Sequence, residues 1–210
     1  MKKIILIMII TAATYIYKPE LFSFIGQQGA FDEQGNAVTL MFTHKKCGKP
    51  CAEAITLLNR RGVRFTEYKL DGDVANQKLW KQYGGVNTFP NMIIGNEKVY
   101  GSYKGMIVSG LAVAYGESAL TSSERYYMNQ HFYNDGKPKL VVYGTSWCPH
   151  CKKLRQGLNK ENISFVEIDV EKSAQKMSII KTMDIGGYPV VYYGYKRIKG
   201  TRLKEVKAAI

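Results

Sequence analysis

The chain has 210 residues, of which 45% are hydrophobic and 22% charged, and this composition is typical of a globular protein. Two compact units fit in this length, each able to bury one core. The net charge of +13 fits a lysine-rich solvated surface, with attraction to anionic lipid or an acidic partner as the next interpretation. Nucleic-acid binding is disfavoured, because the sequence has no basic stripe with an aromatic platform.

The N-terminus has the pattern of a signal peptide or a membrane anchor. Lys2 and Lys3 precede an uncharged, mostly apolar run from Ile4 to Tyr17. The run has 14 residues. A membrane span needs roughly 17 to 25. We therefore expect residues 1–26 to export the protein to the periplasm or another extracytoplasmic space, either cleaved or retained as an anchor. A buried N-terminal helix or strand is the alternative.

A first domain is predicted over residues 36–117, behind a polar, glycine-containing linker at 27–36. Gly62 is a stop signal after its first helix, and Gly95-Asn96 between two apolar runs indicates a hairpin turn. The expected strands are 38–42, 64–70, 91–94 and 98–100, and the expected helices are 52–60, 76–83 and 104–115.

Residues 118–137 are predicted to form a partly helical linker. Thr121 and Glu124 have the spacing of a capping box, which would begin a helix that runs to about Tyr133. The aromatic residues of this stretch indicate that the helix packs against a neighbouring surface. Within it, we expect His131 to have a surface or packing role.

The second predicted domain, over 138–210, repeats the order of the first. Its expected strands are 140–143, 164–170, 190–193 and 196–199, and its expected helices are 152–160, 174–183 and 203–209. In both domains the order of elements predicts an α/β fold, with a four-stranded mixed sheet and helices on both faces.

The most informative motif is Cys148-Pro149-His150-Cys151, between an apolar strand and a helix. Such a Cys-x-x-Cys is typical of thioredoxin-like redox sites. The free amides and positive dipole end of the helix stabilise a thiolate, and a cationic His150 would stabilise it further. Pro149 suits the first helical turn. Trp147 is expected to shield the motif and contact substrates. The alternatives are a solvent-exposed spacer at His150 and ordinary packing for Trp147.

A second motif, Cys-Gly-Lys-Pro-Cys at 47–51, occupies the matching place in the first domain. Cys51 and Cys151 are 100 positions apart, as are Glu67 and Glu167. An aromatic residue followed by proline also recurs, at 89–90 and 188–189. This is an internal repeat at the scale of a domain. All four cysteines lie in the two motifs, which argues for two redox or metal pairs rather than a disulfide scaffold.

Together, these features resemble the glutaredoxin family. The resemblance rests on the motif at 145–154, on Gly-Tyr-Pro at 187–189, and on Gly85 to Pro90 followed by Gly101-Ser102. It covers about 36–117 and 138–210, so the chain is similar to a tandem glutaredoxin-like protein with two thioredoxin-like domains. The resemblance implies thiol–disulfide exchange with protein disulfides or glutathione mixed disulfides. It implies no tightly bound cofactor, with glutathione or a membrane thiol donor as co-substrate.

The resemblance also implies roles for individual residues. Cys148 would be the nucleophile and Cys151 the resolving thiol, with Cys47 and Cys51 as a second, variant pair. Each recurring proline would be cis, with the preceding backbone pairing with substrate, and a later glycine-containing pair would hold the carboxylate of glutathione. The implied substrate-binding residues are Tyr188, Pro189, Gly200 and Thr201 in the second domain, and Phe89, Pro90, Gly101 and Ser102 in the first.

The sequence departs from the family pattern in two places. Three residues separate the first pair of cysteines, so Cys47 is displaced outward if Cys51 keeps its helical position, and Gly48 would absorb the extra residue as a bulge. The lysine that the family often places before its motif is absent in the second domain, which leaves glutathione dependence open there. The alternative functions are an exported disulfide oxidase or isomerase, and a partner-binding or metal-binding module without turnover. The first pair could also be a permanent disulfide, or bind a soft metal with His44.

Overall fold

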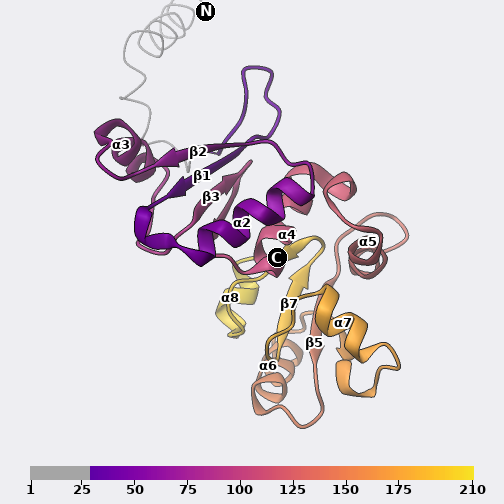
Figure 1. The fold of residues 1–210 in the computed structure, drawn as a ribbon. Helices are drawn as coiled ribbons and strands as arrows, with labels where there is room; N and C mark the ends of the chain where they lie inside the picture. Colours follow the sequence, from indigo (N-terminus) through magenta and orange to yellow (C-terminus); the bar gives the residue numbers. More distant parts are fainter. Residues whose placement is uncertain (1–28) are drawn as a thin grey trace, which may run out of the picture.

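The computed structural model describes residues 29–210, and Figure 1 shows their two α/β units. The signal peptide or anchor predicted at 1–26 lies outside the described residues. Within residues 29–210, no helix combines the length and the apolar character needed to cross a bilayer.

The first domain is a four-stranded mixed sheet with strand order β2-β1-β3-β4. Strand β1 pairs with β2 in parallel and with β3 antiparallel, as the predicted order requires. The strands are β1 (Thr39–Thr43), β2 (Phe65–Lys69), β3 (Asn91–Ile94) and β4 (Glu97–Tyr100), and the helices are α2 (Lys49–Arg60), α3 (Val74–Gln82) and α4 (Lys104–Tyr115).

The second domain has the same topology, with strand order β6-β5-β7-β8. Its strands are β5 (Leu140–Gly144), β6 (Val166–Asp169), β7 (Val190–Tyr193) and β8 (Lys196–Arg197), and its helices are α6 (Pro149–Lys160), α7 (Lys176–Thr182) and α8 (Leu203–Lys207). The predicted fold class is confirmed. Helices α2 and α6 begin earlier than predicted, because each has proline in its first turn, where a missing N–H costs no helical hydrogen bond.

Helix α4 belongs to the cores of both domains, which the sequence analysis did not foresee. Ile107 and Leu111 pack with α2 against the first sheet. Val108 and Ala112 pack with α7 against the second sheet. An α-helix that is apolar all round needs cover on every side, and α4 obtains it by lying between the two sheets (Figure 1).

Both segments predicted as linkers contain residues that pack against the domains. The capping box predicted at Thr121 is present and begins α5 (Ser122–Met128). Tyr127 and Met128 are buried in the core of the second sheet, so the expectation that this helix packs on a surface is confirmed. The linker predicted at 27–36 is partly wrong: Ala30 is buried and its N–H donates to the Gly95 carbonyl over 2.8 Å.

His131 connects the end of the α5 segment to the second sheet. Its side chain is fully buried, with Nδ1 2.9 Å from the Gly194 carbonyl oxygen and Nε2 2.8 Å from the Tyr143 hydroxyl. Burial lowers the pKa of His131 from 6.5 to about 4, outweighing the hydrogen bond to Gly194. The imidazole is therefore neutral in the folded protein at physiological pH.

This buried imidazole predicts a loss of stability in mild acid. Below pH 6.5 the unfolded chain gains a proton on His131 that the folded chain takes up only near pH 4. The stabilisation from the neutral His131 is thus fully present above pH 6.5. The free energy of unfolding should fall by about 3 kcal/mol as the pH falls from 6.5 to about 4. Urea unfolding at several pH values measures this change. The His131→Gln variant should show a shallower pH dependence, and an equal dependence in both proteins would contradict the prediction.

Candidate active site

The cysteines of the second motif lie where strand β5 passes into helix α6. Cys148 is the N-cap of α6, and its Sγ accepts a hydrogen bond from the Cys151 N–H over 3.2 Å. The same sulfur lies 3.7 Å from the carbonyl oxygen of Tyr188, to which its S–H donates. Both cysteines are free thiols, and only 4% of Cys148 and none of Cys151 is exposed.

The two thiols have different electrostatic surroundings. The sulfur of Cys148 accepts a backbone hydrogen bond at the start of α6, and the positive end of a helix stabilises negative charge. Burial and the hydrogen bond to Cys148 raise the pKa of the Cys151 thiol to about 12. Cys148 is therefore suited to make the first attack, and Cys151 must lose its proton before it can react.

The predicted substrate-binding residues Tyr188 and Pro189 lie beside this pair. The Tyr188–Pro189 peptide bond is cis, as is Phe89–Pro90 in the first domain, and both were predicted to be so. Trp147 is 66% exposed and its ring meets that of Tyr188 edge to face, with centroids 6.1 Å apart. The two aromatic side chains therefore flank the approach to Cys148. His150 lies exposed in the first turn of α6.

A half-buried carboxylate also lies near the site, at a residue to which the sequence pattern assigned no role. Glu167 pairs with Arg155 of α6. The carboxylate of Glu167 and the Sγ of Cys151 lie 2.9 and 3.2 Å from the place that a Cβ on Gly144 would take. A side chain at position 144 would therefore require Glu167 and Cys151 to shift. The only sequence signal for Glu167 was its spacing of 100 from Glu67, whose carboxylate accepts a hydrogen bond from Thr43 over 2.7 Å.

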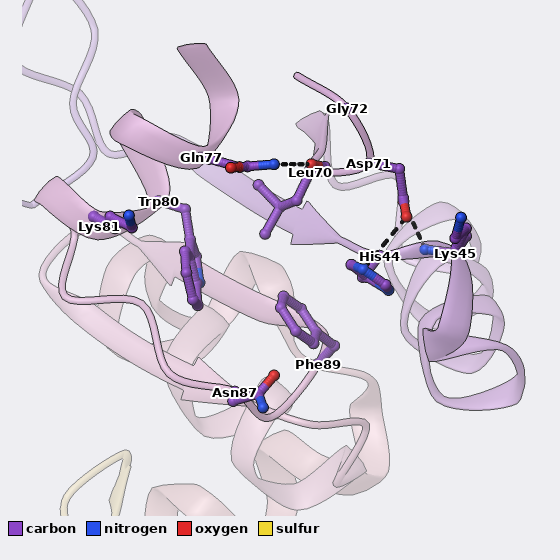
Figure 2. A pocket seen from close by; sticks show the side chains of 10 residues that line it. All are labelled: His44, Lys45, Leu70, Asp71, Gly72, Gln77, Trp80, Lys81, Asn87 and Phe89. Carbon is purple, nitrogen blue, oxygen red and sulfur yellow. Dashed lines mark hydrogen bonds and ion pairs between the residues drawn. The ribbon is translucent and has the colours of Figure 1, made fainter. Parts of the chain in front are cut away.

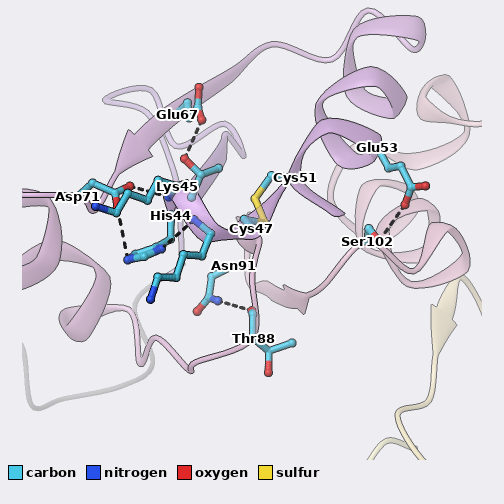
Figure 3. Close-up of a disulfide and its surroundings, with 12 residues drawn as sticks. His44, Lys45, Cys47, Cys51, Glu53, Glu67, Asp71, Thr88, Asn91 and Ser102 are labelled. Carbon is cyan, nitrogen blue, oxygen red and sulfur yellow. Dashed lines mark hydrogen bonds and ion pairs between the residues drawn. A yellow bond between two sulfur atoms is a disulfide. The ribbon is translucent and has the colours of Figure 1, made fainter. Parts of the chain in front are cut away.

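In the first domain, Cys47 and Cys51 form a disulfide (Figure 3). Cys47 ends a short 3-10 turn, Lys45–Cys47, and Cys51 lies in the first turn of α2. Gly48 between these elements has a φ of 52°, so glycine absorbs the extra residue as predicted. Both sulfurs are bonded to each other. No group of three or more potential metal-ligating side chains occurs among residues 29–210.

The turn before this disulfide is held by His44 and Asp71. His44 Nε2 is 3.4 Å from an Asp71 carboxylate oxygen, while His44 Nδ1 accepts from the Lys46 N–H over 3.1 Å. A cavity of about 590 Å³ lies next to His44, and the side chains of Trp80 and Phe89 line it (Figure 2). A second hollow beside Cys47 also contains His44 and Phe89, so the cleft flanks the cis-proline segment and reaches the disulfide.

Both pairs predicted to hold a glutathione carboxylate are next to a carboxylate of the protein itself. In the first domain, the Ser102 hydroxyl donates to Glu53 over 3.3 Å (Figure 3). In the second, the Arg202 N–H, directly after Gly200 and Thr201, donates to Glu205 over 2.9 Å. Hydrogen bonds from Arg202 hold the pKa of Glu205 below its ordinary value, so this group is charged at neutral pH.

Two thioredoxin-like sheets, each with a cysteine pair at the start of a helix and a cis-proline in the same domain, define the class of thiol–disulfide oxidoreductases. The Glutaredoxin family model matches residues 39–99 and 140–198. These two matches cover more than half of the chain, and the chain belongs to the glutaredoxin family.

Curated relatives match parts of the chain. A thioredoxin domain-containing protein of Acanthamoeba polyphaga mimivirus is 29% identical over 86 residues, which cover 36% of this chain and 25% of that protein. Mycoredoxin 1 of Corynebacterium glutamicum is 29% identical over 56 residues, which cover 26% of this chain and 68% of mycoredoxin. The chain thus spans a quarter of the mimivirus protein.

Solved structures of glutaredoxins are similar to part of the chain. The holo form of glutaredoxin C1 from Populus tremula x tremuloides has a TM-score of 0.33 and 16% identity, covering 42% of this chain and 85% of its own. Oxidized glutaredoxin 2 from Chlamydomonas reinhardtii has a TM-score of 0.32 and 20% identity, covering 41% of this chain and 80% of its own.

Proposed function

We propose that the chain reduces disulfides of protein substrates by dithiol exchange through Cys148 and Cys151. The asymmetry of the pair is the observation that supports this proposal most strongly. Cys148 accepts a helix N-terminal amide and lies beside the cis-proline segment, whereas Cys151 is fully buried with a pKa near 12. This arrangement suits a nucleophile that attacks first and a partner that stays protonated until a mixed disulfide has formed.

The proposed reaction has two exchanges. The Cys148 thiolate attacks one sulfur of the substrate disulfide, the substrate S–S bond breaks, and the leaving thiolate takes a proton from solvent. Cys151 then loses its proton and attacks Cys148 Sγ, which releases the second substrate thiol and forms the Cys148–Cys151 disulfide. Two electrons pass to the substrate, and a dithiol protein or two molecules of glutathione restore the free thiols. We assign Glu167 as the acceptor of the Cys151 proton, because its carboxylate and the Cys151 sulfur lie 2.9 and 3.2 Å from the place that a Cβ on Gly144 would take.

We propose the Cys47–Cys51 disulfide as a second exchange site, because it lies beside an open hollow that reaches the cis-proline segment. Glu53 in the first domain opposes binding of another carboxylate at Ser102. For both domains we therefore propose that protein disulfides are the preferred substrates and that glutathione is used less well.

The reduction potential of each cysteine pair tests the proposed function. Each pair is equilibrated in glutathione buffers on the background of the other pair's double serine variant, and thiol trapping with mass spectrometry counts the reduced protein. A value of about −200 mV for Cys148/Cys151 is expected for a glutaredoxin-like reductase. A value near −120 mV would instead support a disulfide oxidase. If Cys47/Cys51 stays oxidised at every ratio, the second site is a structural disulfide.

The carboxylate of Glu205 predicts weak use of glutathione by the second domain. Glu205→Gln keeps a hydrogen-bond acceptor for the Arg202 N–H but removes the charge that repels a glutathione carboxylate. The glutathione concentration that gives half the maximal rate should fall by about threefold, the size expected for one exposed charge pair. The matched control is Glu161→Gln, because Glu161 follows the far end of α6 from Cys148. An equal effect of both variants would contradict the prediction.

A further inference from the structure

A hollow of about 290 Å³ lies between the two domains, next to the second active site. The second domain contributes Pro189, Ile198 and Gly200 to its walls, and the first domain contributes Tyr103 and Met106. Pro189 follows Tyr188, whose carbonyl lies 3.7 Å from Cys148 Sγ. The hollow is therefore continuous with the cis-proline segment of the proposed site, although part of its wall comes from the other domain.

The part of the wall that the first domain contributes is held in place by hydrogen bonds between the two domains. At the start of α4, the Gly105 N–H donates to the Asp184 carboxylate over 2.8 Å. One turn later, Ser109 donates its hydroxyl to the Tyr195 carbonyl over 2.9 Å and accepts from the Arg197 N–H over 2.6 Å. These contacts lie beside the buried packing of α4 on the second sheet. Tyr103, the N-cap of α4, and Met106, in its first turn, are thus held at the hollow by a helix fixed to the second domain.

The chemistry of the hollow fits an apolar side chain. Tyr103 is 72% exposed, and the aromatic and thioether side chains of the first domain face proline and isoleucine of the second. The exposed ammonium of Lys199 lies at the rim, 4.7 Å from the ring centroid of Tyr100. A short acidic peptide segment with a bulky apolar residue would bury that residue and place its carboxylate near Lys199.

We propose that Tyr103 and Met106 determine the specificity of the second active site by binding an apolar side chain next to the disulfide of an acidic polypeptide substrate. This inference rests on the proposed function. Tyr103 and Met106 are positioned to bind substrate without touching the reacting sulfurs. The first domain then serves the second as part of its substrate groove, independently of its own cysteines.

Two chromogenic peptides test the inference. Both are short and acidic and carry nitrothiobenzoate on their cysteine, and they differ only in having leucine or glycine next to that cysteine. The reduced full chain with Cys47→Ser and Cys51→Ser is mixed with each peptide, so that release of the coloured thiol reports the attack by Cys148. The ratio of the two second-order rate constants is the preference for leucine. An apolar pocket gives a preference of about tenfold for one such side chain.

Tyr103→Ala and Met106→Ala should each reduce this preference to about twofold or less. Tyr103→Phe should keep it, because phenylalanine retains the aromatic ring and loses only the hydroxyl. The matched control Tyr126→Ala removes an exposed aromatic residue of α5 and should also keep the preference. If both peptides react equally with the parent protein, or the preference survives both alanine substitutions, the inference is overturned. If neither peptide releases its thiol, the proposed function fails instead.

Discussion

Replacing Cys148 by serine is expected to abolish disulfide exchange by the second domain, with a loss of about a thousandfold or more in rate. A hydroxyl at this position stays protonated and cannot act as the attacking thiolate. Cys151→Ser should retain the first attack and accumulate a mixed disulfide between Cys148 and the substrate. The release rate of the coloured peptide thiol measures the first effect, and intact-protein mass spectrometry measures the second.

The control for this prediction is the double variant Cys47→Ser and Cys51→Ser, which removes the disulfide of the first domain. It should leave the attack by Cys148 within about twofold of the parent rate, since the two pairs lie in separate domains. A Cys148→Ser variant that stays active when Cys47 and Cys51 are also serine, or adduct formation on Cys151 instead of Cys148, would show that the roles of the two thiols are wrongly assigned.

Replacing Glu124 by alanine should give the largest loss of stability, about 3 to 5 kcal/mol in the free energy of unfolding. Its carboxylate is buried and lies 2.6 Å from the Arg61 guanidinium, with Lys104 at 3.9 Å. The substitution leaves the Arg61 charge buried without its partner and also removes the capping box of α5. Urea unfolding monitored by circular dichroism measures the change.

Glu117→Ala is the matched control, because its ion pair with Arg125 is long and exposed at 3.8 Å. It should cost less than about 1 kcal/mol. Burial alone raises the pKa of Glu124, but hydrogen bonds from Arg61 and Thr121 outweigh it and hold the pKa below its ordinary value of 4.5. The stabilisation is therefore present above pH 4.5 and is lost as the pH falls through the folded value. Equal losses in the two variants would contradict this account.

Much of the fold could be predicted from the sequence, because its signals are local. The apolar runs of the central strands, the proline-initiated helices and the hairpin at Gly95 each depend on a few neighbouring residues. The shared role of α4 could not be predicted in this way. Its helix is apolar on every face, which indicates burial but not the surface that buries it. The packing of Ala30 was missed for a different reason, because a single buried residue among polar neighbours leaves no pattern in the sequence.

The candidate active site likewise has features that the sequence predicts and features that depend on tertiary packing. The two motifs predicted which cysteines would come together in pairs, and the resemblance to glutaredoxins implied both cis-prolines. The carboxylates of Glu53 and Glu205 beside the expected glutathione positions were missed, because their placement depends on side-chain contacts rather than on spacing. The burial of Cys151 and the approach of Glu167 likewise arise from the packing of α6 on the sheet.

The position of α4 changes what the duplication of this fold means. Tandem domains on a flexible tether melt in separate transitions and can be expressed one at a time. Here the apolar residues Val108 and Ala112 of one repeat complete the hydrophobic core of the other. Heat should therefore unfold both repeats in a single cooperative transition, and a chain cut after Tyr115 would leave the second repeat with an uncovered apolar face. The two repeats are therefore not independent folding units, and the folded state of each depends on the other.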